Sequence, residues 1–377
     1  MKETVLLVLP LKTEGQIDVN NIRGLIDVLL MNLQMCSSIK IKAHLFMMKN
    51  IIEKNEMLDY EIFNQDYGLK LFEQMEYDLE EPDIIEDVLD IASQPGFNDD
   101  ADIILSVFAK EEFGIKENFS LEIKLSPASD EYNIYKETFS GSLLEISKFL
   151  PTISYSILES LGKKVDISIE KWPETNDEDA LENFLKGITL ANSFYIGFHK
   201  NFRQPINHLM KAFNSKPRMQ LAAYRLLGFI ENLIENPTLP GESYLFGLSV
   251  LSKIEKMQDL EGSIYMIIAE MYKKVGNETL HKKNIKRAFE KDPLNEEITI
   301  VMGNYYEERK DWDNAKIVYE TYLSAKGVPS HLIFHNLGVI YAEQGKIEQA
   351  IDIWCKSLKL VSNYPSRSEE RRVGKEC

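Results

Sequence analysis

Short apolar runs and longer stretches with a single apolar face alternate along the first part of the chain. The run that ends at Pro10 predicts a buried strand, because Pro lacks the amide proton that a sheet ladder needs. The next apolar residues recur every three or four positions, which predicts a helix capped by Asp18 or Asn20. These apolar residues are Ile22, Leu25, Ile26, Leu29, Leu30 and Leu33. Residues 39–43 then alternate and predict a half-buried strand.

Strand and helix patterns continue further along the chain. Helices are predicted at 68–75 and 84–91, and a buried strand follows at 102–108. Two alternating segments, 119–125 and 132–139, predict a hairpin with one covered face.

A long helix at 142–161 closes this part of the chain. Its predicted core residues are Leu144, Phe149, Ile153, Ile157 and Leu158. Helices interleaved with strands predict an α/β domain over residues 1–162, in which a mixed sheet packs on helices.

Three motifs in residues 1–162 resemble the TolB-amino-terminal/CsgG-type α/β domain. They are the opening Val-Leu-Pro strand (8–10), the series Ala-Asp-Ile-Ile-Leu-Ser (101–106) and the helix that runs through 150–161. The resemblance implies a domain that precedes helical repeats in bacterial signalling and regulatory proteins. Leu11 replaces the aromatic residue that usually follows the Pro, and residues 50–66 match poorly, so an unrelated α/β domain is the alternative.

Beyond a polar connector at 163–180, the chain is patterned as helices alone. Residues 181–260 predict two degenerate helical hairpins, the second with a longer period than the first. In the first hairpin Ala212 and Pro217 stand at the spacing of a helical repeat, whereas Pro205 occupies a position that is usually small.

Residues 261–365 contain a regular repeat. Its units start at Gly262, Glu296 and His331, which are 34 and 35 residues apart. Position 8 of each unit is small, and positions 7, 11 and 24 are large apolar or aromatic residues in most of the copies. Small residues at positions 8 and 20 let the two helices of one unit approach closely, and the large residues fill the space between successive helices.

This pattern resembles the tetratricopeptide repeat (TPR), whose period is about 34 residues. The three regular units are 262–295, 296–330 and 331–364. The predicted fold is therefore an α/β amino-terminal domain followed by an all-α, TPR-like solenoid of helical hairpins.

The composition narrows the classes of partner. Acidic residues outnumber basic ones by 60 to 43, and the net charge is -17. A nucleic-acid-binding face needs clustered Lys and Arg, so we expect no nucleic-acid partner. No apolar window approaches the roughly 20 residues of a membrane span, and three cysteines are too few to staple a scaffold. We expect a cytoplasmic protein without a membrane span or disulfides.

No motif in the sequence predicts catalysis or a cofactor. Phosphate-loop, dinucleotide-binding and nucleophile-elbow patterns are missing. His331 and His335 have metal-ligand spacing on a predicted helix, but no Glu general base lies between them and no third ligand accompanies them. We therefore interpret them as ordinary exposed histidines and expect no enzymatic activity, no metal and no cofactor.

The TPR resemblance implies a binding face for a protein or peptide ligand, made by positions 2, 5, 9 and 12 of the first helix in each unit. The predicted site residues are Met266, Glu270, Lys273, Glu297, Ile300, Asn304, Glu307, Leu332, His335 and Val339. The Lys/Asn/Arg set by which chaperone-binding relatives grip a terminal carboxylate is not reproduced, because Ile300 replaces a basic residue.

These features predict a non-catalytic scaffold or adaptor protein that binds another protein through its repeats. The alternative is the sensory or regulatory part of a larger bacterial signalling protein, whose effector (a cyclase or a transcription regulator) is missing from this chain.

The last residues, 366–377, have no apolar period and resemble DNA-adapter sequence read through in frame. We interpret them as a processing scar, with a genuine basic tail as the alternative. On the first interpretation, Ile351, Leu358 and Val361 of the last unit lack a covering neighbour, and self-association through the carboxy-terminal repeat is expected.

Overall fold

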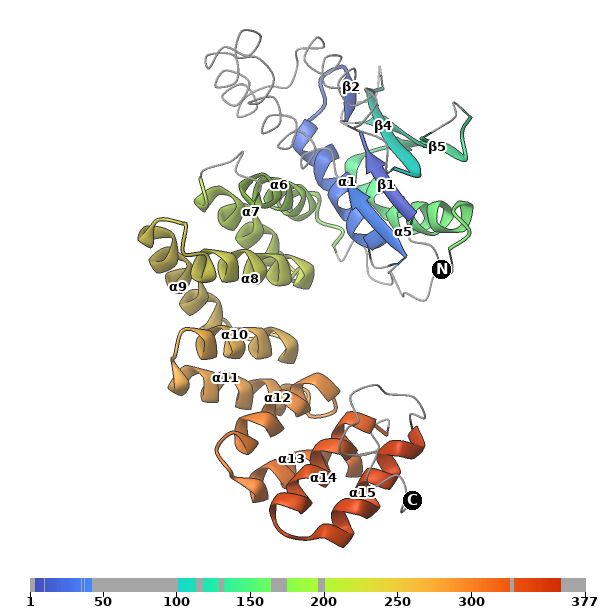
Figure 1. Cartoon of the computed structure of the whole chain (residues 1–377). Helices are drawn as coiled ribbons and strands as arrows, with labels where there is room; N and C mark the ends of the chain where they lie inside the picture. Colours follow the sequence, from blue (N-terminus) through green and yellow to red (C-terminus); the bar gives the residue numbers. More distant parts are fainter. Residues whose placement is uncertain are drawn as a thin grey trace, which may run out of the picture. The chain divides into compact units, whose positions relative to one another are not determined.

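A computed structural model of the chain (Figure 1) divides into two compact units, residues 1–229 and residues 230–377. The structure describes residues 4–9, 11–34, 36, 38–42, 101–112, 118–128, 132–163, 175–195, 201–325 and 329–360. The helices predicted at 68–75 and 84–91, Val361 and the segment 366–377 lie outside the described residues.

The first unit contains a mixed sheet. Its strands are β1 (Thr4–Val8), β2 (Lys12–Glu14), β3 (Ile39–Lys42), β4 (Ile103–Glu111), β5 (Phe119–Pro127) and β6 (Tyr135–Gly141). Their order is β3-β1-β4-β5-β6, and β2 also pairs with β4. β1 runs parallel to β3 and β4, whereas β4, β5 and β6 are antiparallel neighbours. The predicted mixed sheet and the predicted hairpin are both confirmed.

Helix α1 (Val19–Gln34) begins at a cap that the sequence predicts. The Asp18 carboxylate accepts hydrogen bonds from the backbone N–H groups of Asn20 at 3.0 Å and Asn21 at 3.3 Å. Asp18 is thus the cap, and Asn20 lies inside the helix. The six apolar residues predicted for its buried face are all buried.

Helix α5 (Leu143–Ser160) packs against β5, β6 and α1. Ser142 and Glu145 form a reciprocal capping box at its start. Two of the five predicted core residues lie outside the core: Leu144 is only half-buried, and Phe149 is 44% exposed. Phe149 stands one residue before Leu150 and so falls beside the buried face, where its ring contacts Phe139 of β6 at a centroid distance of 5.6 Å.

Helix α6 (Glu178–Tyr195) packs against α1 and so connects the helices that follow the sheet with the α/β part of the first unit. A Cβ atom at Gly24 of α1 would lie 2.5 Å from the Cβ atom of Leu185, so the two helices touch where α1 has no side chain. α6 also pairs with α7 (Arg203–Phe213), closely enough that a Cβ atom at Gly187 would lie 2.7 Å from Leu209. The compact unit therefore continues past residue 162, the domain boundary that the sequence predicts.

The division between the units falls within α8 (Gln220–Glu235), which α9 (Gly241–Glu255) follows. Six helices come next in the second unit. They are α10 (Gly262–Lys274), α11 (Glu278–Lys291), α12 (Glu296–Glu307), α13 (Trp312–Ser324), α14 (His331–Glu343) and α15 (Ile347–Leu360). They pair as α10 with α11, α12 with α13, and α14 with α15 (Figure 1). This series of antiparallel hairpins is a TPR-like helical solenoid.

The first helices of the three hairpins begin at Gly262, Glu296 and His331, the residues that start the three repeats in the sequence. Side chains cap the starts of α12 and α14. Asn295 and Ser330 each accept a hydrogen bond from the backbone N–H of the residue three positions further along the chain.

The small residues at position 8 face the residue at position 24 of the same unit. A Cβ atom at Gly303 would overlap the ring of Tyr319, and one at Gly338 would overlap the ring of Trp354. The indole N–H of Trp354 also donates to the His335 carbonyl oxygen at 3.1 Å, so this side chain packs inside its own hairpin as the sequence predicts. Glycine is thus needed at position 8 of these two units, because an aromatic ring occupies the space that a Cβ atom would take.

The first regular unit solves the same packing problem with smaller residues. Ala269 stands at position 8 and Ile285 at position 24, and both are fully buried. A side chain without a ring at position 24 leaves room for a methyl group at position 8, so the two positions vary together in size.

Candidate functional site

The predicted binding face lies on α10, α12 and α14, the first helices of the three hairpins; we call it the first-helix face. Lys273, Glu297, Asn304 and Leu332 are exposed, and Glu270, Ile300, Glu307, His335 and Val339 are half-buried. Met266 is a correction, because it is only 8% exposed and belongs to the core. α12 packs beside α10, the helix that carries Met266.

Three of the predicted residues, Asn304, Glu307 and His335, lie around the hydroxyl of Tyr319 or the carboxylate that it binds. Tyr319 Oη donates to Glu307 Oε1 at 2.7 Å, and Asn304 Oδ1 lies 3.4 Å from the same hydroxyl. The Asn336 amide donates to Tyr319 Oη at 3.1 Å. We call these residues, from α12, α13 and α14, the tyrosine cluster.

Burial controls the charge of the tyrosine cluster. It raises the pKa of Glu307 above the ordinary 4.5, while the hydrogen bond from Tyr319 and the charge of His335 act in the opposite direction. Burial and the neighbouring Glu307 carboxylate raise the pKa of Tyr319 as well. Tyr319 is therefore a neutral donor at physiological pH, and it fixes the orientation of a carboxylate that is poorly solvated.

An ion pair joins the first-helix face of two successive repeats. Lys273 Nζ lies 2.7 Å from Glu308 Oε1, and this hydrogen bond raises the pKa of Lys273. Both side chains are more than a third exposed, so the pair contributes about 0–1 kcal/mol to stability. Lys273 is consequently engaged by its own chain, and Glu270, Glu297 and Glu307 give the rest of the face an acidic character.

Sequence reasoning missed Tyr319, Asn336 and Glu308 as members of this face. Tyr319 stands at position 24, where the repeat pattern predicts a side chain that fills the space between helices. Its ring is indeed fully buried, but its hydroxyl reaches the face. The available signal is the choice of Tyr instead of Phe, since a buried phenol needs a hydrogen-bond partner.

The tyrosine cluster gives a direct prediction for Tyr319→Phe. The ring stays and the hydrogen bond to Glu307 is lost, so we expect the free energy of unfolding to fall by about 1–2 kcal/mol and the pKa of Glu307 to rise further. Urea denaturation of the full chain measures the first effect.

Tyr341→Phe is the matched control, because the Tyr341 hydroxyl donates to Glu320 at 3.3 Å in an exposed position. We expect a change near zero there. Equal losses in the two variants would show that the tyrosine cluster is no more than a surface contact.

We also searched the described residues for metal sites and for membrane-spanning helices. Among them, no group of three or more His, Cys, Asp or Glu side chains could hold a metal ion, and no helix is long and apolar enough to cross a membrane. One expectation is corrected: Cys355 is disulfide-bonded, whereas Cys36 is free.

Among known proteins, only solved structures are similar to this chain, and the similarity is one of fold. No protein-family model and no curated protein sequence matches the chain. Similar solved structures include MamA, at 15% identity and a TM-score of 0.33 over 52% of this chain and 97% of MamA. YrrB, described as a TPR protein with an unusual peptide-binding site, is similar at 16% identity and a TM-score of 0.35, over 54% of this chain and 94% of YrrB.

A third similar structure is the APC/C hetero-tetramer Cut9–Hcn1, at 15% identity and a TM-score of 0.32, with coverage of 57% of this chain and 43% of that one. Values this low assign no family. The TPR-like character of the second unit therefore rests on its own helices and their packing, and the TolB/CsgG-like domain stays a prediction.

Proposed function

We propose that this chain is a non-catalytic scaffold whose second unit binds an extended segment of a partner protein along the first-helix face. The tyrosine cluster carries the proposal, because it brings polar groups of three helices together on one surface. The exposed amide of Asn304 has both a donor and an acceptor to offer to a peptide backbone. Burial destabilises the ionised form of the Glu307 carboxylate. A positively charged group of the partner would stabilise that ionised form, so the site favours a cationic partner.

The chemistry of the face specifies the segment. Glu270, Glu297 and Glu307 favour a partner segment that carries Lys or Arg. Leu332, which is 37% exposed, and the half-buried Val339 lie on α14 and favour an apolar side chain beside the basic residues. We therefore expect a basic segment with one apolar anchor.

The test is a selection of linear peptides from a random library against the full chain, followed by calorimetric measurement of affinity. We expect selected peptides to be basic with an apolar residue, and Glu307→Lys to weaken their binding at least tenfold. Glu290→Lys is the matched control, because Glu290 is exposed on α11, a second helix, and its replacement changes the net charge equally.

Two results would overturn the proposal: a library that yields no binder, or binders that are equally sensitive to both charge reversals.

The pH dependence of peptide binding is a further check. Because burial raises the pKa of Glu307, binding should weaken on acidification at a higher pH than an ordinary carboxylate would give.

A regulatory role for the first unit is the second candidate. The observation that favours it is a cavity between α1, α6 and α8 within that unit.

A further inference from the structure

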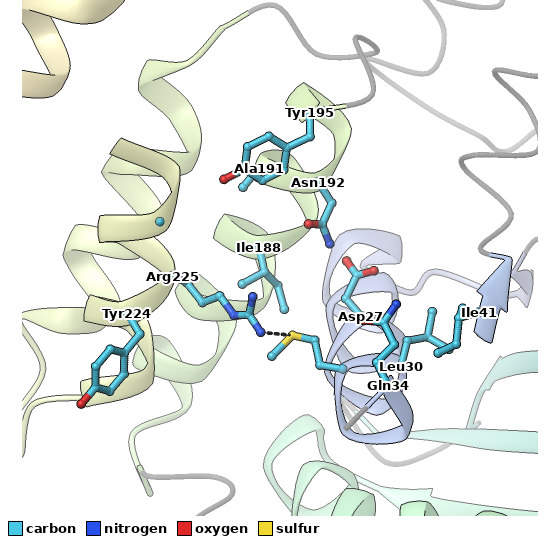
Figure 2. A pocket seen from close by; sticks show the side chains of 12 residues that line it. Asp27, Leu30, Gln34, Ile41, Ile188, Ala191, Asn192, Tyr195, Tyr224 and Arg225 are labelled. Carbon is cyan, nitrogen blue, oxygen red and sulfur yellow. Dashed lines mark hydrogen bonds between the residues drawn. The ribbon is translucent and has the colours of Figure 1, made fainter. Parts of the chain in front are cut away.

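The first unit contains a cavity of about 350 Å³ that opens between α1, α6 and α8 (Figure 2). Its floor is apolar, with Leu30, Ile188 and Ala191 all buried. Its mouth is lined by more exposed residues, among them Arg225 and Tyr195, which is 47% exposed. An apolar floor with a few polar groups above it is the usual character of a small-molecule site.

Two opposite charges lie in the wall of this cavity. Asp27 of α1 accepts a hydrogen bond from the Asn192 side chain of α6, and Figure 2 shows both side chains at the cavity. Arg225 of α8 donates to the thioether of Met31 at 2.8 Å (Figure 2). A thioether is a weak acceptor, and an anionic group at the same place would be a much stronger partner for a guanidinium.

The charges of Asp27 and Arg225 attract each other, but this attraction does not make up for the solvation that both groups have lost. Burial raises the pKa of Asp27 from 3.8 to about 6, although Asn192, Arg23 and Arg225 all favour its ionised form. Partial desolvation by the surrounding protein likewise lowers the pKa of Arg225, although part of its side chain is exposed at the mouth. Each charged group therefore lacks part of the solvation that it would have in water, and an oppositely charged group inside the cavity would restore it.

We propose that this cavity binds a free, zwitterionic amino acid with an apolar side chain. The ammonium group pairs with Asp27, the carboxylate pairs with Arg225, and the side chain rests on Leu30 and Ile188. The ligand class follows from the presence of both charges above an apolar floor. A purely cationic ligand would leave Arg225 without its anion, and a purely anionic one would meet the Asp27 carboxylate.

Gly228 of α8 provides a way to close the cavity. It lines the cavity, and a Cβ atom at this position would meet no heavy atom within 4 Å. A larger side chain can therefore enter the open space without disturbing the packing of the helix. Gly228→Leu occupies the cavity, and Gly228→Ala is its control because a methyl group fills little of it.

The experiment is thermal unfolding and calorimetry of the full chain with a panel of the free apolar amino acids. We expect at least one of them to bind, and its amide and its N-acetyl form to bind at least tenfold more weakly, since each lacks one charge. Asp27→Asn and Arg225→Gln should each weaken binding at least tenfold, and Gly228→Leu should abolish it. Gly228→Ala and the peptide-site variant Glu307→Lys should leave binding unchanged.

The control Glu307→Lys keeps this proposal separate from the proposed function, because peptide binding can fail while amino-acid binding persists. The absence of any binder in the panel would overturn the inference. Binding that survives in Gly228→Leu, or that does not distinguish the free amino acid from its amide, would overturn it too.

Discussion

Gly303→Leu will destabilise the repeat region and leave the stability of the first unit unchanged. A Cβ atom at Gly303 would overlap the ring of Tyr319, which is fully buried and cannot move aside without losing its hydrogen bond to Glu307. Forcing extra volume into a packed core costs about 1–3 kcal/mol, and the displaced hydrogen bond adds about 1 kcal/mol. We expect a total loss of roughly 3 kcal/mol in the free energy of unfolding.

The effect is measurable by urea denaturation together with limited proteolysis. Helical repeats contact mainly their neighbours, so damage should remain within the second unit and a stable fragment of the first unit should persist. The matched control is Gly228→Leu, which also replaces a helical glycine but enters open space. It should gain up to about 1 kcal/mol from helix propensity. Loss of the first-unit fragment in Gly303→Leu would contradict the two-unit organisation.

Asp27→Asn will make the first unit more stable at neutral pH. Because burial raises the pKa of Asp27 from 3.8 to about 6, the folded state holds the proton more tightly than the unfolded state. The stability that comes from the neutral carboxyl is complete below about pH 4 and is lost as the pH rises through about 6. The full pKa change corresponds to roughly 3 kcal/mol, and solvent access to the half-buried side chain lowers this, so we expect about 2 kcal/mol at pH 7.

Urea denaturation at pH 4 and at pH 7 tests this prediction. The variant and the parent should be nearly equal at pH 4 and should separate at pH 7. Glu159→Gln, which alters an exposed carboxylate on α5, is the control and should show no such pH dependence. A variant that is less stable than the parent at pH 7 would mean that Asp27 is a stabilising anion, and the environment inferred for it would be wrong.

The periodic parts of the chain could be predicted from the sequence because one buried face dictates their pattern. The helix that Asp18 caps, the β5–β6 hairpin and the starts of α10, α12 and α14 are such cases. Phe149 was misplaced because periodicity does not define how wide the covered face is.

The candidate sites were harder to predict, since they depend on contacts between distant segments. Asp27 stands beside Ile26 in an amphipathic helix and resembles an ordinary solvent-facing residue until α6 and α8 pack over it. The repeat positions of Asn304 and Glu307 predict that both lie on the binding face, but the hydroxyl that joins them comes from α13. No spacing within α12 could have shown that contribution.

The pairing of position 8 with position 24 makes single helices of the first hairpin incompatible with those of the third. A chimera that carried α10 with α15 would set the methyl group of Ala269 against an indole as large as Trp354, and the two would collide. The reciprocal chimera, α14 with α11, would set Gly338 against Ile285 and leave an unfilled space. The two helices of one hairpin must therefore be exchanged together. Chimeras joined at a boundary between hairpins should fold, and chimeras joined between the two helices of one hairpin should not.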